Sequence, residues 1–351
     1  MIRLNQREWG AILIALFVVV LSGCGGSGNG EPVHSVSATN TAASTGSGDT
    51  ESVAQGTSPR TEEKSAPNAK QDTQIVSTKH GDVEIPAHPQ RIITQGYLAN
   101  FLAFGIKPVG APYWEIDSPY MKHLSEGIED IGQIDGGSVE KMLSLNSDLI
   151  VTVGGDEKLN EQYRKIAPTL VIPYGTYHEV HVEMRAFGEI LGKEKEAEEW
   201  LAVFDDKVKK AKASIQGLVK EGSTYSIMGP FGKEFYIYGD GVNRGGQAIY
   251  QQLGLTPPDK VRKDLIEAKI DALSISEEKM ADYAGDYIFL DISGGAEFDE
   301  NSPIWASLDA VKNNRVFKLD GDRFWPYDPI AVQAQVEEVA AMIQERQGTT
   351  K

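Results

Sequence analysis

The clearest pattern of hydrophobic and polar positions in the chain runs from Glu194 to Gln216. Apolar residues recur there three or four positions apart, the spacing of one buried stripe on an α-helix: Ala197, Trp200, Leu201, Phe204, Val208, Ala211 and Ile215. Glutamates fill the first turns and lysines the last turns, an order that complements the helix macrodipole. The pattern predicts one continuous helix of roughly 35 Å, long enough to join two domains.

Short apolar strands alternate with helices on both sides of this helix. Before it, the pattern predicts a hairpin and then a strand-helix alternation: Ile75–Ser77, Val83–Ile85, Arg91–Thr94, Tyr97–Phe104, Glu140–Leu145, Asp148–Val153, Glu157–Ile166, Thr169–Pro173 and His178–Leu191. After it, the alternation continues over Tyr225–Met228, Phe235–Tyr238, Gln247–Leu253, Glu278–Tyr283, Tyr287–Ile292, Trp305–Val311, Arg315–Leu319 and Ile330–Gln344. We therefore predict an α/β fold of two lobes with mostly parallel central sheets, residues 74–192 and 217–346, joined by one long α-helix within 193–216.

The start of the chain has the pattern of an export signal. Two arginines precede an apolar run from Gly10 to Leu21, which is too short to cross a bilayer as a helix. Small residues then lead to Cys24, which favours a lipoprotein signal peptide in 1–23 and a lipidated Cys24; an ordinary signal peptide with a chance cysteine is the alternative. Residues 24–73 nearly lack large apolar side chains, so we expect a disordered tether.

Composition narrows the classes of function. With 351 residues and 40% hydrophobic content, the chain can build two cores. Its formal net charge of -17 disfavours nucleic acid and bare anionic membranes, because an acidic surface repels both, so we expect membrane attachment through the lipid anchor alone. Cys24 is the only cysteine, which excludes an internal disulfide and any multi-cysteine metal site.

The usual catalytic motifs are missing from the sequence. It has no Gly-x-Ser-x-Gly elbow, no phosphate loop ending in Gly-Lys-Ser/Thr, and no free thiol once Cys24 is lipidated. His178 and His181 lie three residues apart and could share a metal ion, although exposed helix positions explain such a pair more often. The glycine-rich segment Gly239–Gly246 follows a strand and precedes a helix, but its spacing is not that of a nucleotide-binding loop.

Aromatic residues and arginines gather instead at predicted strand ends and in the loops between elements. They are Trp114, Tyr236, Tyr238, Arg244, Arg323, Phe324, Trp325 and Tyr327. In α/β lobes such connections line the ligand crevice, although packing alone explains any single one of them. Ring faces combined with guanidinium donors suit an amphipathic organic ligand that carries oxygen atoms.

A helix-to-strand unit occurs once in each half of the chain. Residues 138–151 and 276–289 align without gaps and share Ser, Glu-Lys-Met, Asp and Ile at matching positions. A Ser cap and an acidic second helical residue suit any unit of this kind, so helix capping is one interpretation. The other is a common contact made by Glu140 and Glu278, which hold equivalent positions in the two units.

Three stretches carry a family resemblance: Tyr236–Asp240 continuing through Arg244–Gly246 to Leu255, then Tyr283–Ile288, then Trp325–Pro329. Together with the sequence before Cys24, they resemble the iron-siderophore substrate-binding lipoproteins of Gram-positive bacteria. Within that family they resemble the branch that binds ferric hydroxamates. The resemblance implies a two-lobed protein hinged by one long helix, which captures ferric siderophore and hands it to the permease subunits of an ABC importer. It also implies that the siderophore supplies every iron ligand, so the protein needs no cofactor or metal site. We expect a monomer, lipid-anchored at the extracellular face of the cell membrane.

The same resemblance assigns residues to the site. Positions that match the ferric-hydroxamate pocket are Tyr97, Tyr236, Arg244 and Trp325. The arginine would donate to iron-bound hydroxamate oxygens. Val242 stands where relatives can have a tryptophan, and the stretch Ile227–Phe231 lacks the paired arginines of catecholate-binding relatives, which disfavours a tricatecholate ligand. Glu140 and Glu278 match glutamates that dock, one per lobe, into arginine pockets on the two importer subunits.

Two alternatives stay open. Haem, cobalamin or a carboxylate siderophore would suit the same class of binding protein, and ligand titration separates them. A lipid-anchored hydrolase acting on a sugar or an ester would need a convergent acid–base pair, which no sequence motif supplies. The missing motifs and the resemblance together favour a binding protein over an enzyme.

Replacing Cys24 with alanine is expected to release the protein from the membrane. Two or more acyl chains hold a protein stably on a bilayer, and the variant would carry none. The measurement is the membrane-bound fraction after cell fractionation. An unchanged fraction for Cys24→Ala would show that the lipoprotein interpretation is wrong.

Overall fold

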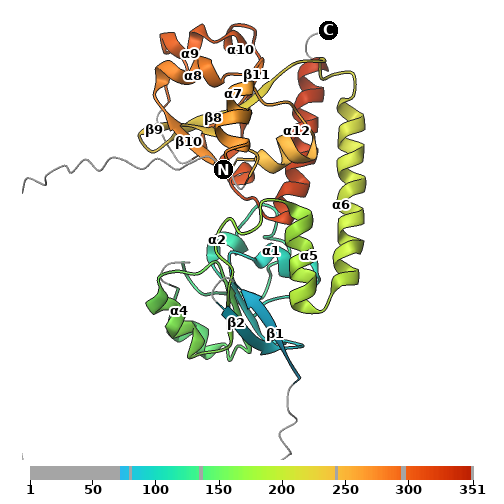
Figure 1. The fold of residues 1–351 in the computed structure, drawn as a ribbon, viewed down its shortest axis with the longest axis vertical. Helices are drawn as coiled ribbons and strands as arrows, with labels where there is room; N and C mark the ends of the chain where they lie inside the picture. Colours follow the sequence, from blue (N-terminus) through green and yellow to red (C-terminus); the bar gives the residue numbers. More distant parts are fainter. Residues whose placement is uncertain (1–71, 79–80, 134–136, 242–243, 294–297, 349–351) are drawn as a thin grey trace, which may run out of the picture. The chain divides into compact units, whose positions relative to one another are not determined.

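The computed structural model describes residues 72–78, 81–133, 137–241, 244–293 and 298–348 (Figure 1). The expected signal peptide, Cys24, nearly all of the expected tether and Val242 lie outside these ranges. Within the part of the chain that is described, no helix combines the length and the apolar character needed to cross a bilayer.

The N-terminal lobe is built on a five-stranded parallel sheet. Its strands, in the order in which they pair, are β5 (Glu129–Asp130), β4 (Gly110–Ala111), β3 (Ile92–Gln95), β6 (Leu149–Thr152) and β7 (Thr169–Val171). Parallel neighbours need crossover connections, and the helices in this lobe are α1 (Leu98–Ala103), α2 (Tyr113–Ile116), α3 (Val139–Ser144), α4 (Glu157–Arg164) and α5 (Val180–Leu191). The expected hairpin precedes the sheet as β1 (Thr73–Thr78) and β2 (Gly81–Pro86).

The C-terminal lobe has a mixed five-stranded sheet. Its order is β10 (Ala272–Ile275), β9 (Glu234–Tyr238), β8 (Tyr225–Phe231), β11 (Tyr287–Asp291) and β12 (Val316–Leu319). The strands β8, β11 and β12 are parallel, as predicted, whereas β9 runs antiparallel to both β8 and β10. The reason is the two-residue connection between β8 and β9, because a turn that short can join only antiparallel strands.

Short helical segments connect the strands of this lobe, and one long helix follows its last strand. They are two π-helical segments (Gln247–Gln252 and Arg262–Ile266), a 3-10 turn (Glu277–Lys279), α7 (Asp259–Val261), α8 (Met280–Tyr283), α9 (Pro303–Ser307), α10 (Asp309–Lys312), α11 (Gly321–Phe324) and the long α12 (Pro329–Gly348). The helical pattern predicted around Trp305 is thus divided into α9 and α10, with Leu308 between them in an extended conformation.

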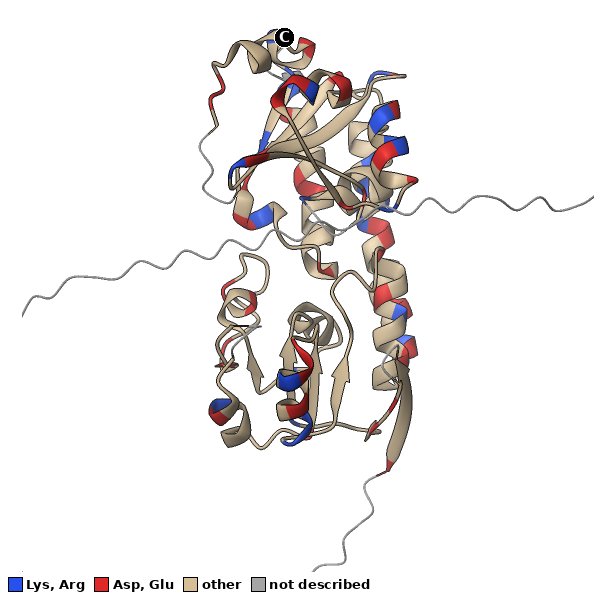
Figure 2. Cartoon of the chain, turned by 60° about the vertical axis from the view of Figure 1, so that its left-hand side comes forward, with Lys and Arg blue, Asp and Glu red and all other residues tan. Residues whose placement is uncertain are grey.

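The long helix predicted from the hydrophobic pattern is confirmed as α6 (Glu194–Ile215). Its buried stripe consists of Ala197, Leu201, Phe204, Val208, Ala211 and Ile215. Trp200 is half-buried and stacks on Phe204 with ring centroids 5.6 Å apart. Both acidic and basic positions lie along the helices of the molecule (Figure 2), and on α6 the charged atoms of Lys210 and Asp206 lie 2.6 Å apart. The helix is therefore amphipathic along its whole length, with α5 and α12 packed on its apolar side.

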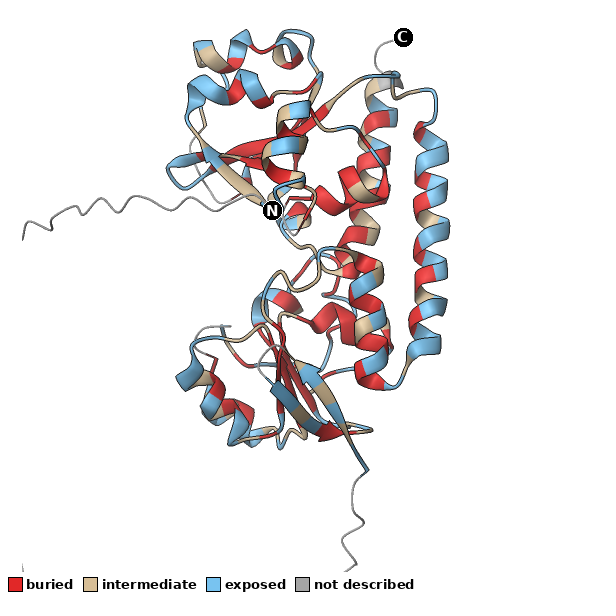
Figure 3. Ribbon diagram, in the orientation of Figure 1, coloured by how far each residue is buried: buried red, intermediate tan, exposed pale blue. Residues whose placement is uncertain are grey.

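The helix α12 also connects the lobes. It packs on α6, and in addition on α1 and α5 of the N-terminal lobe. The largest apolar cluster follows the same route and includes Ile92 of β3, Phe204 of α6, Tyr225 of β8 and Val336 of α12. Buried residues line the inner sides of these elements, while their outer sides are exposed (Figure 3). The lobes thus share apolar packing through α12 as well as the covalent link through α6.

The repeated helix-to-strand unit occupies the same place in both sheets. β6 and β11 each lie between a central strand and an edge strand. The shared aspartates do the same work: Asp148 accepts the backbone N–H of Arg91 at 2.9 Å just before β3, and Asp286 accepts that of Thr224 at 2.8 Å just before β8. The shared Met and Ile side chains are buried in both units, at Met142, Met280, Ile150 and Ile288.

The two serines of the repeated unit behave differently. Ser138 caps α3 by accepting the backbone N–H of Lys141 at 3.1 Å, as predicted. Ser276 makes no side-chain cap, and the chain after it begins as a 3-10 turn. The expectation of a serine cap is therefore wrong for the second unit, where the 3-10 turn changes which N–H groups face the hydroxyl.

Candidate functional site

An arginine and four aromatic rings meet on one face of the β8–β9 hairpin. The guanidinium carbon of Arg244 lies 3.6 Å from the ring centroid of Trp325, 5.3 Å from that of Tyr238 and 5.7 Å from that of Phe231. Tyr236 lies 6.2 Å from Tyr238 and 6.3 Å from Phe231, between ring centroids. We call these five residues the Arg244 cluster. It brings together Tyr236, Arg244 and Trp325, which the sequence predicts as site residues from three separate segments.

Strand geometry explains how the cluster forms. Tyr236 and Tyr238 are two residues apart on β9 and so point to the same face of the sheet. Phe231 ends β8 and packs on Trp325, with ring centroids 5.5 Å apart. Phe231 was not predicted as a site residue, although the hairpin register that places it beside β9 could have been inferred from the short turn after it.

Arg244 is held by its backbone and by a buried partner. Its φ of 47° lies in the left-handed region, and the following Gly245 has a φ of 78°. Arg244 is only 3% exposed, and its Nε donates to Oδ2 of Asp291 at 2.6 Å. A non-glycine residue in this conformation costs of the order of 1 kcal/mol, which is tolerated where the side chain has a specific task.

The cluster combines apolar surface with hydrogen-bond donors. Trp325 is 47% exposed and Phe231 is 40% exposed, so two large rings share one open patch. The Tyr236 hydroxyl donates to Glu234 at 2.6 Å, and this hydrogen bond raises the pKa of Tyr236. Burial raises the pKa of Tyr238 as well, so both phenols stay neutral at ordinary pH. The arrangement can bind an amphipathic ligand by ring faces and by arginine N–H groups.

Loops from the two lobes touch next to this cluster. Tyr174, which follows β7, packs edge-to-face on Tyr327, with ring centroids 5.1 Å apart. Gln251 donates its side-chain amide to two backbone carbonyls, at 2.9 Å to His178 and at 2.7 Å to Asp240. One of these carbonyls precedes α5, and the other belongs to the segment Gly239–Gly246. Gln251 therefore links the loop that carries Arg244 to the N-terminal lobe.

Besides Tyr327, three of the predicted site residues lie outside the Arg244 cluster. Tyr97 is buried against Phe187, and its hydroxyl donates to the backbone carbonyl of Ile172 at 2.9 Å. Trp114 of α2 is 42% exposed. Among the described residues, neither ring makes an aromatic contact with the cluster.

Arg323 likewise has other partners than the cluster. Its Nε donates to Glu338 of α12 at 2.9 Å, and its guanidinium carbon lies 4.9 Å from the ring centroid of Tyr120. The hydrogen bonds that Arg323 donates to Glu338 raise the pKa of Arg323, which keeps it charged. Tyr120 belongs to the N-terminal lobe, so this ion pair is part of a contact between the lobes.

Two buried glutamates organise the helix ends beneath the N-terminal loops. Glu115 of α2 accepts the backbone N–H groups of Gly96 and Leu98, both at 2.8 Å, and so caps the start of α1. Glu183 of α5 accepts the side-chain amide of Asn100 at 2.9 Å. Within the described part of the chain the Oδ1 atom of Asn100 is buried without a hydrogen-bond partner. A neutral Glu183 carries a proton that this atom could accept.

These carboxyl groups have unusual protonation. Burial raises the pKa of Glu115 to about 7, although its two backbone N–H partners lower it. Burial raises the pKa of Glu183 to about 8. Asp328, which caps α12 through the N–H of Ala331 at 2.8 Å, has its pKa raised by burial to about 6. Burial thus favours the protonated form of all three carboxyl groups.

The two histidines predicted as a possible metal pair face different partners. His178 lies 3.7 Å from Asp271, between Nδ1 and Oδ1. His181 bonds to Glu179 through one ring nitrogen and to Asp205 at 2.8 Å through the other. Among the described residues, no three His, Cys, Asp or Glu side chains are grouped as metal ligands.

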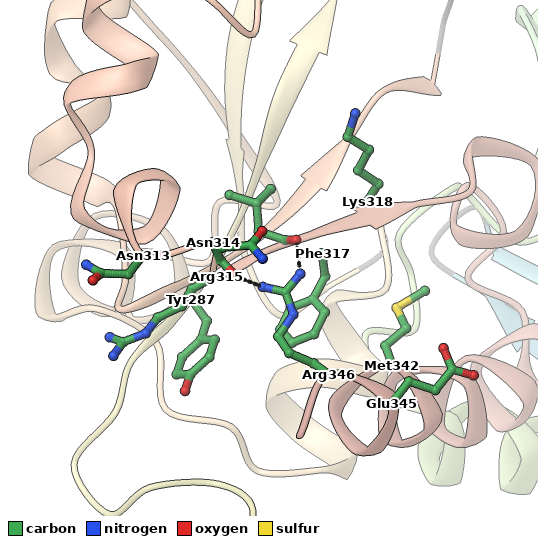
Figure 4. Close-up of a pocket in the computed structure, with 10 residues that line it drawn as sticks. Tyr287, Asn313, Asn314, Arg315, Phe317, Lys318, Met342, Glu345 and Arg346 are labelled. Carbon is green, nitrogen blue, oxygen red and sulfur yellow. Dashed lines mark hydrogen bonds between the residues drawn. The ribbon is translucent and has the colours of Figure 1, made fainter. Parts of the chain in front are cut away.

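A pocket of about 840 Å³ lies beside β12 and the end of α12 (Figure 4). The guanidinium of Arg346 donates into it, to the carbonyl of Asn314 and, at 2.5 Å, to that of Val316. Both carbonyls face outward from the edge strand, because the intervening carbonyl of Arg315 accepts from β11. Arg346 therefore covers polar groups that could otherwise pair with another strand. The pocket shares no residue with the Arg244 cluster.

Glu140 and Glu278 are both exposed at the starts of their helical segments. The backbone N–H of Glu278 itself and the hydroxyl of Ser276 lower the pKa of Glu278. Neither glutamate takes part in an ion pair with another described residue. Both carboxylates are therefore available at the surface.

Comparison with known proteins gives consistent results. A family model described as periplasmic binding protein matches residues 94–322. The iron(3+)-hydroxamate-binding protein YxeB of Bacillus subtilis is 38% identical over 302 residues, covering 84% of this chain and 92% of that protein. A solved FhuD-fold protein from B. subtilis, the binding component of a Fep/Fec-like ferrichrome ABC transporter, is 37% identical with a TM-score of 0.68, covering 77% of this chain and 100% of that one. FhuD2 of Staphylococcus aureus with bound ferrioxamine B is 26% identical with a TM-score of 0.64, covering 73% and 98%.

Glu183→Gln is expected to reduce the pH dependence of stability. The pKa of Glu183 rises from an ordinary 4.5 to about 8 on folding, so the native state binds more protons than the unfolded state between these values. The free energy of unfolding therefore falls as the pH rises through this window, and a glutamine removes that contribution. The measurement is urea unfolding at several pH values from about 5 to about 8.

The matched control is Glu189→Gln, an exposed position on the same helix α5. It should leave the pH dependence unchanged. If Glu183→Gln keeps the same pH dependence as the unaltered protein, Glu183 does not carry a proton in the native state.

Proposed function

The chain belongs to the periplasmic binding protein family, and we propose that it captures a ferric hydroxamate siderophore and delivers it to an ABC importer. The observation that carries this proposal is the Arg244 cluster, which offers ring faces and a fixed guanidinium in one place. The names of the relatives support the hydroxamate class, since YxeB is an iron(3+)-hydroxamate-binding protein and FhuD2 holds ferrioxamine B.

The chemistry of the cluster suits this ligand. A ferric siderophore presents an organic shell and a ring of iron-bound oxygen atoms that carry partial negative charge. Ring faces of Trp325 and Tyr236 would contact the shell, and the terminal N–H groups of Arg244 would donate to the oxygens. The siderophore itself ligates the iron, so recognition needs no protein side chain on the metal. We infer binding without turnover.

The predicted site residues divide into two groups under this proposal. Tyr236, Arg244, Trp325, Trp114 and Tyr327 are proposed to contact the siderophore. The burial of Tyr97 and the ion pair of Arg323 favour supporting roles, in which these two residues hold the loops that carry the contacts. A carboxylate siderophore, haem or cobalamin is the alternative ligand class, which competition against a ferric hydroxamate would decide.

The location follows from the start of the chain. We propose that Cys24 is the lipid attachment point and that residues 1–23 are removed, leaving the protein on the extracellular face of the cell membrane. The segment Leu21–Cys24 supports this proposal. The domain boundaries at 74–192, 193–216 and 217–346 are part of the same proposal, as is a monomeric state.

Glu140 and Glu278 are proposed as the importer contacts. The shared aspartates, methionines and isoleucines of the repeated unit have local tasks, because the aspartates bond to backbone and the Met and Ile side chains are buried. The glutamates have no such task that both halves share. A two-lobed carrier that meets a pseudo-twofold importer needs one equivalent contact on each lobe, and these two positions supply it.

Ferric hydroxamates are expected to quench tryptophan fluorescence on binding, because Trp325 is half-exposed within the proposed site. Trp325→Ala should weaken binding by about 1.5–3 kcal/mol, the usual value for losing one large apolar contact. The measurement is a fluorescence or calorimetric titration with ferrichrome and ferrioxamine B. Trp200→Phe on α6 is the matched control and should keep the affinity. Equal affinity for bare ferric ion or iron-free citrate would contradict the proposed ligand class.

Charge reversal of both glutamates is expected to reduce uptake without reducing binding. In the double variant Glu140→Lys/Glu278→Lys, like charges would face the importer arginines, which weakens docking. The measurement is cellular uptake of radioactive ferric hydroxamate, with siderophore affinity and surface amount determined in parallel.

The matched control makes the same charge change at two other exposed positions, one in each lobe: Glu189→Lys/Glu221→Lys. It should keep uptake near normal. Normal uptake by the double variant at Glu140 and Glu278 would show that these glutamates do not dock the importer. Their only role would then be at the starts of their helical segments.

A further inference from the structure

The partner of Arg244 is itself a completely buried charge. Asp291 is 0% exposed, and its Oδ2 accepts the Arg244 Nε at 2.6 Å and the Ser293 hydroxyl at 2.9 Å. Its Oδ1 accepts the backbone N–H of Ser293 at 3.1 Å. Four lone-pair sites on a buried carboxylate need such donors, and the arginine is the oppositely charged one among them. The arginine and the aspartate thus form a buried pair with no net charge.

Close backbone packing fixes the aspartate. Asp291 ends β11, and a Cβ atom at Gly229 of the neighbouring β8 would lie 1.9 Å from its carbonyl oxygen. A Cβ atom at Gly321 would lie 2.6 Å from the Cβ of Ser293. Glycines at these two positions allow the strand end and α11 to close around the carboxylate. The position of Asp291 is therefore set by the sheet and does not depend on a ligand.

The aspartate in turn sets the orientation of Arg244. Its Nε is held at one edge by Asp291, and one face of the guanidinium lies on Trp325 at 3.6 Å. With one edge and one face occupied, the two terminal nitrogens have a fixed direction. Rotating them would break a buried ion pair, which is strongly unfavourable.

The surroundings add no uncompensated positive charge. Within the described part of the chain, Arg244 is the basic member of its cluster, and His178, which lies beside Gly241 of the same loop, faces Asp271 at 3.7 Å. Glu234 lies against Tyr236. An arginine facing a ligand would ordinarily attract anions, but here its charge is already balanced before the ligand arrives.

This balance has a consequence for the ligand class. Three hydroxamates, each with one negative charge, neutralise a ferric ion, whereas three catecholates or citrate-type ligands leave the complex strongly anionic. We propose that Asp291 is a specificity-determining residue, which orients Arg244 toward iron-bound oxygens while cancelling its charge, so that the site favours uncharged ferric trihydroxamates over anionic complexes. The proposal rests on the siderophore-binding function proposed above and names the charge class that this site selects.

The test compares two ligands that share one ferric trihydroxamate core and differ in net charge. Ferrioxamine B acetylated on its terminal amine is uncharged, and the succinylated form carries one negative charge on the same ferric trihydroxamate. Dissociation constants of both are measured at low and high ionic strength. The unaltered protein should bind the uncharged form at least as tightly as the anionic form, with little dependence on salt.

Asp291→Asn should change this selectivity. The asparagine oxygen can still accept from Arg244, but the arginine charge is no longer balanced. The ratio of affinities should shift toward the succinylated form by roughly four- to sixteenfold, as for unit charges about 10 Å apart at an effective dielectric constant of about 20–40. The double variant Arg244→Gln/Asp291→Asn is again uncharged and should return to the original ratio with weaker binding. Ser293→Ala, which keeps both charges, should leave the ratio unchanged.

Each outcome decides the matter. A folded Asp291→Asn protein with an unchanged ratio would overturn the proposal. So would an unaltered protein that prefers the succinylated form and loses this preference in salt, and this arm decides even if Asp291→Asn does not fold. If the unaltered protein binds neither ligand, the siderophore-binding function itself fails, and the inference about charge falls with it.

Discussion

A charge that is removed from water needs a partner of opposite charge. Arg244 and Asp291 form such a buried pair in the C-terminal lobe, where the end of β11 meets the segment Gly239–Gly246. Breaking such a pair by removing one partner typically costs about 3–5 kcal/mol, so the strand end and the loop that supply it are held in one arrangement. The left-handed backbone of Arg244 follows from this constraint. So does the position of Trp325, whose ring covers the guanidinium at 3.6 Å. The open ring face beside this pair is then fixed in place before any ligand arrives.

The parts of the fold that depend on local sequence could be predicted, and those that depend on strand pairing could not. The stripe of α6 is visible because a helical period repeats over many turns. The strand β10 (Ala272–Ile275) was missed because four partly exposed residues give almost no periodic signal. The direction of β9 depends on a two-residue turn after Phe231, which the strand pattern does not include. The sheet of the C-terminal lobe is therefore mixed where the N-terminal sheet is parallel.

The same limit applies to the site. Tyr236, Arg244 and Trp325 could be predicted because each belongs to a recognisable stretch, and the structure brings them together. Asp291 could not, because one aspartate at a strand end has the appearance of an ordinary turn residue. Arg323 was predicted to line the site because it is an arginine in a loop between two elements. Its partner is instead Glu338 on α12, and no sequence pattern indicates that contact. Arginine partners are set by tertiary packing, which a linear pattern does not contain.

The repeated unit shows how function can be separated from folding within one motif. Its aspartates, methionines and isoleucines have the same structural tasks in both lobes, and those tasks explain their identity. The glutamates differ, because Glu140 starts an α-helix behind a serine cap, whereas Glu278 lies in a 3-10 turn without one. Helix capping therefore does not account for the same residue in both places. A partner with matching twofold symmetry would impose that identity on both lobes whatever their local geometry, and this is the property expected of an importer interface.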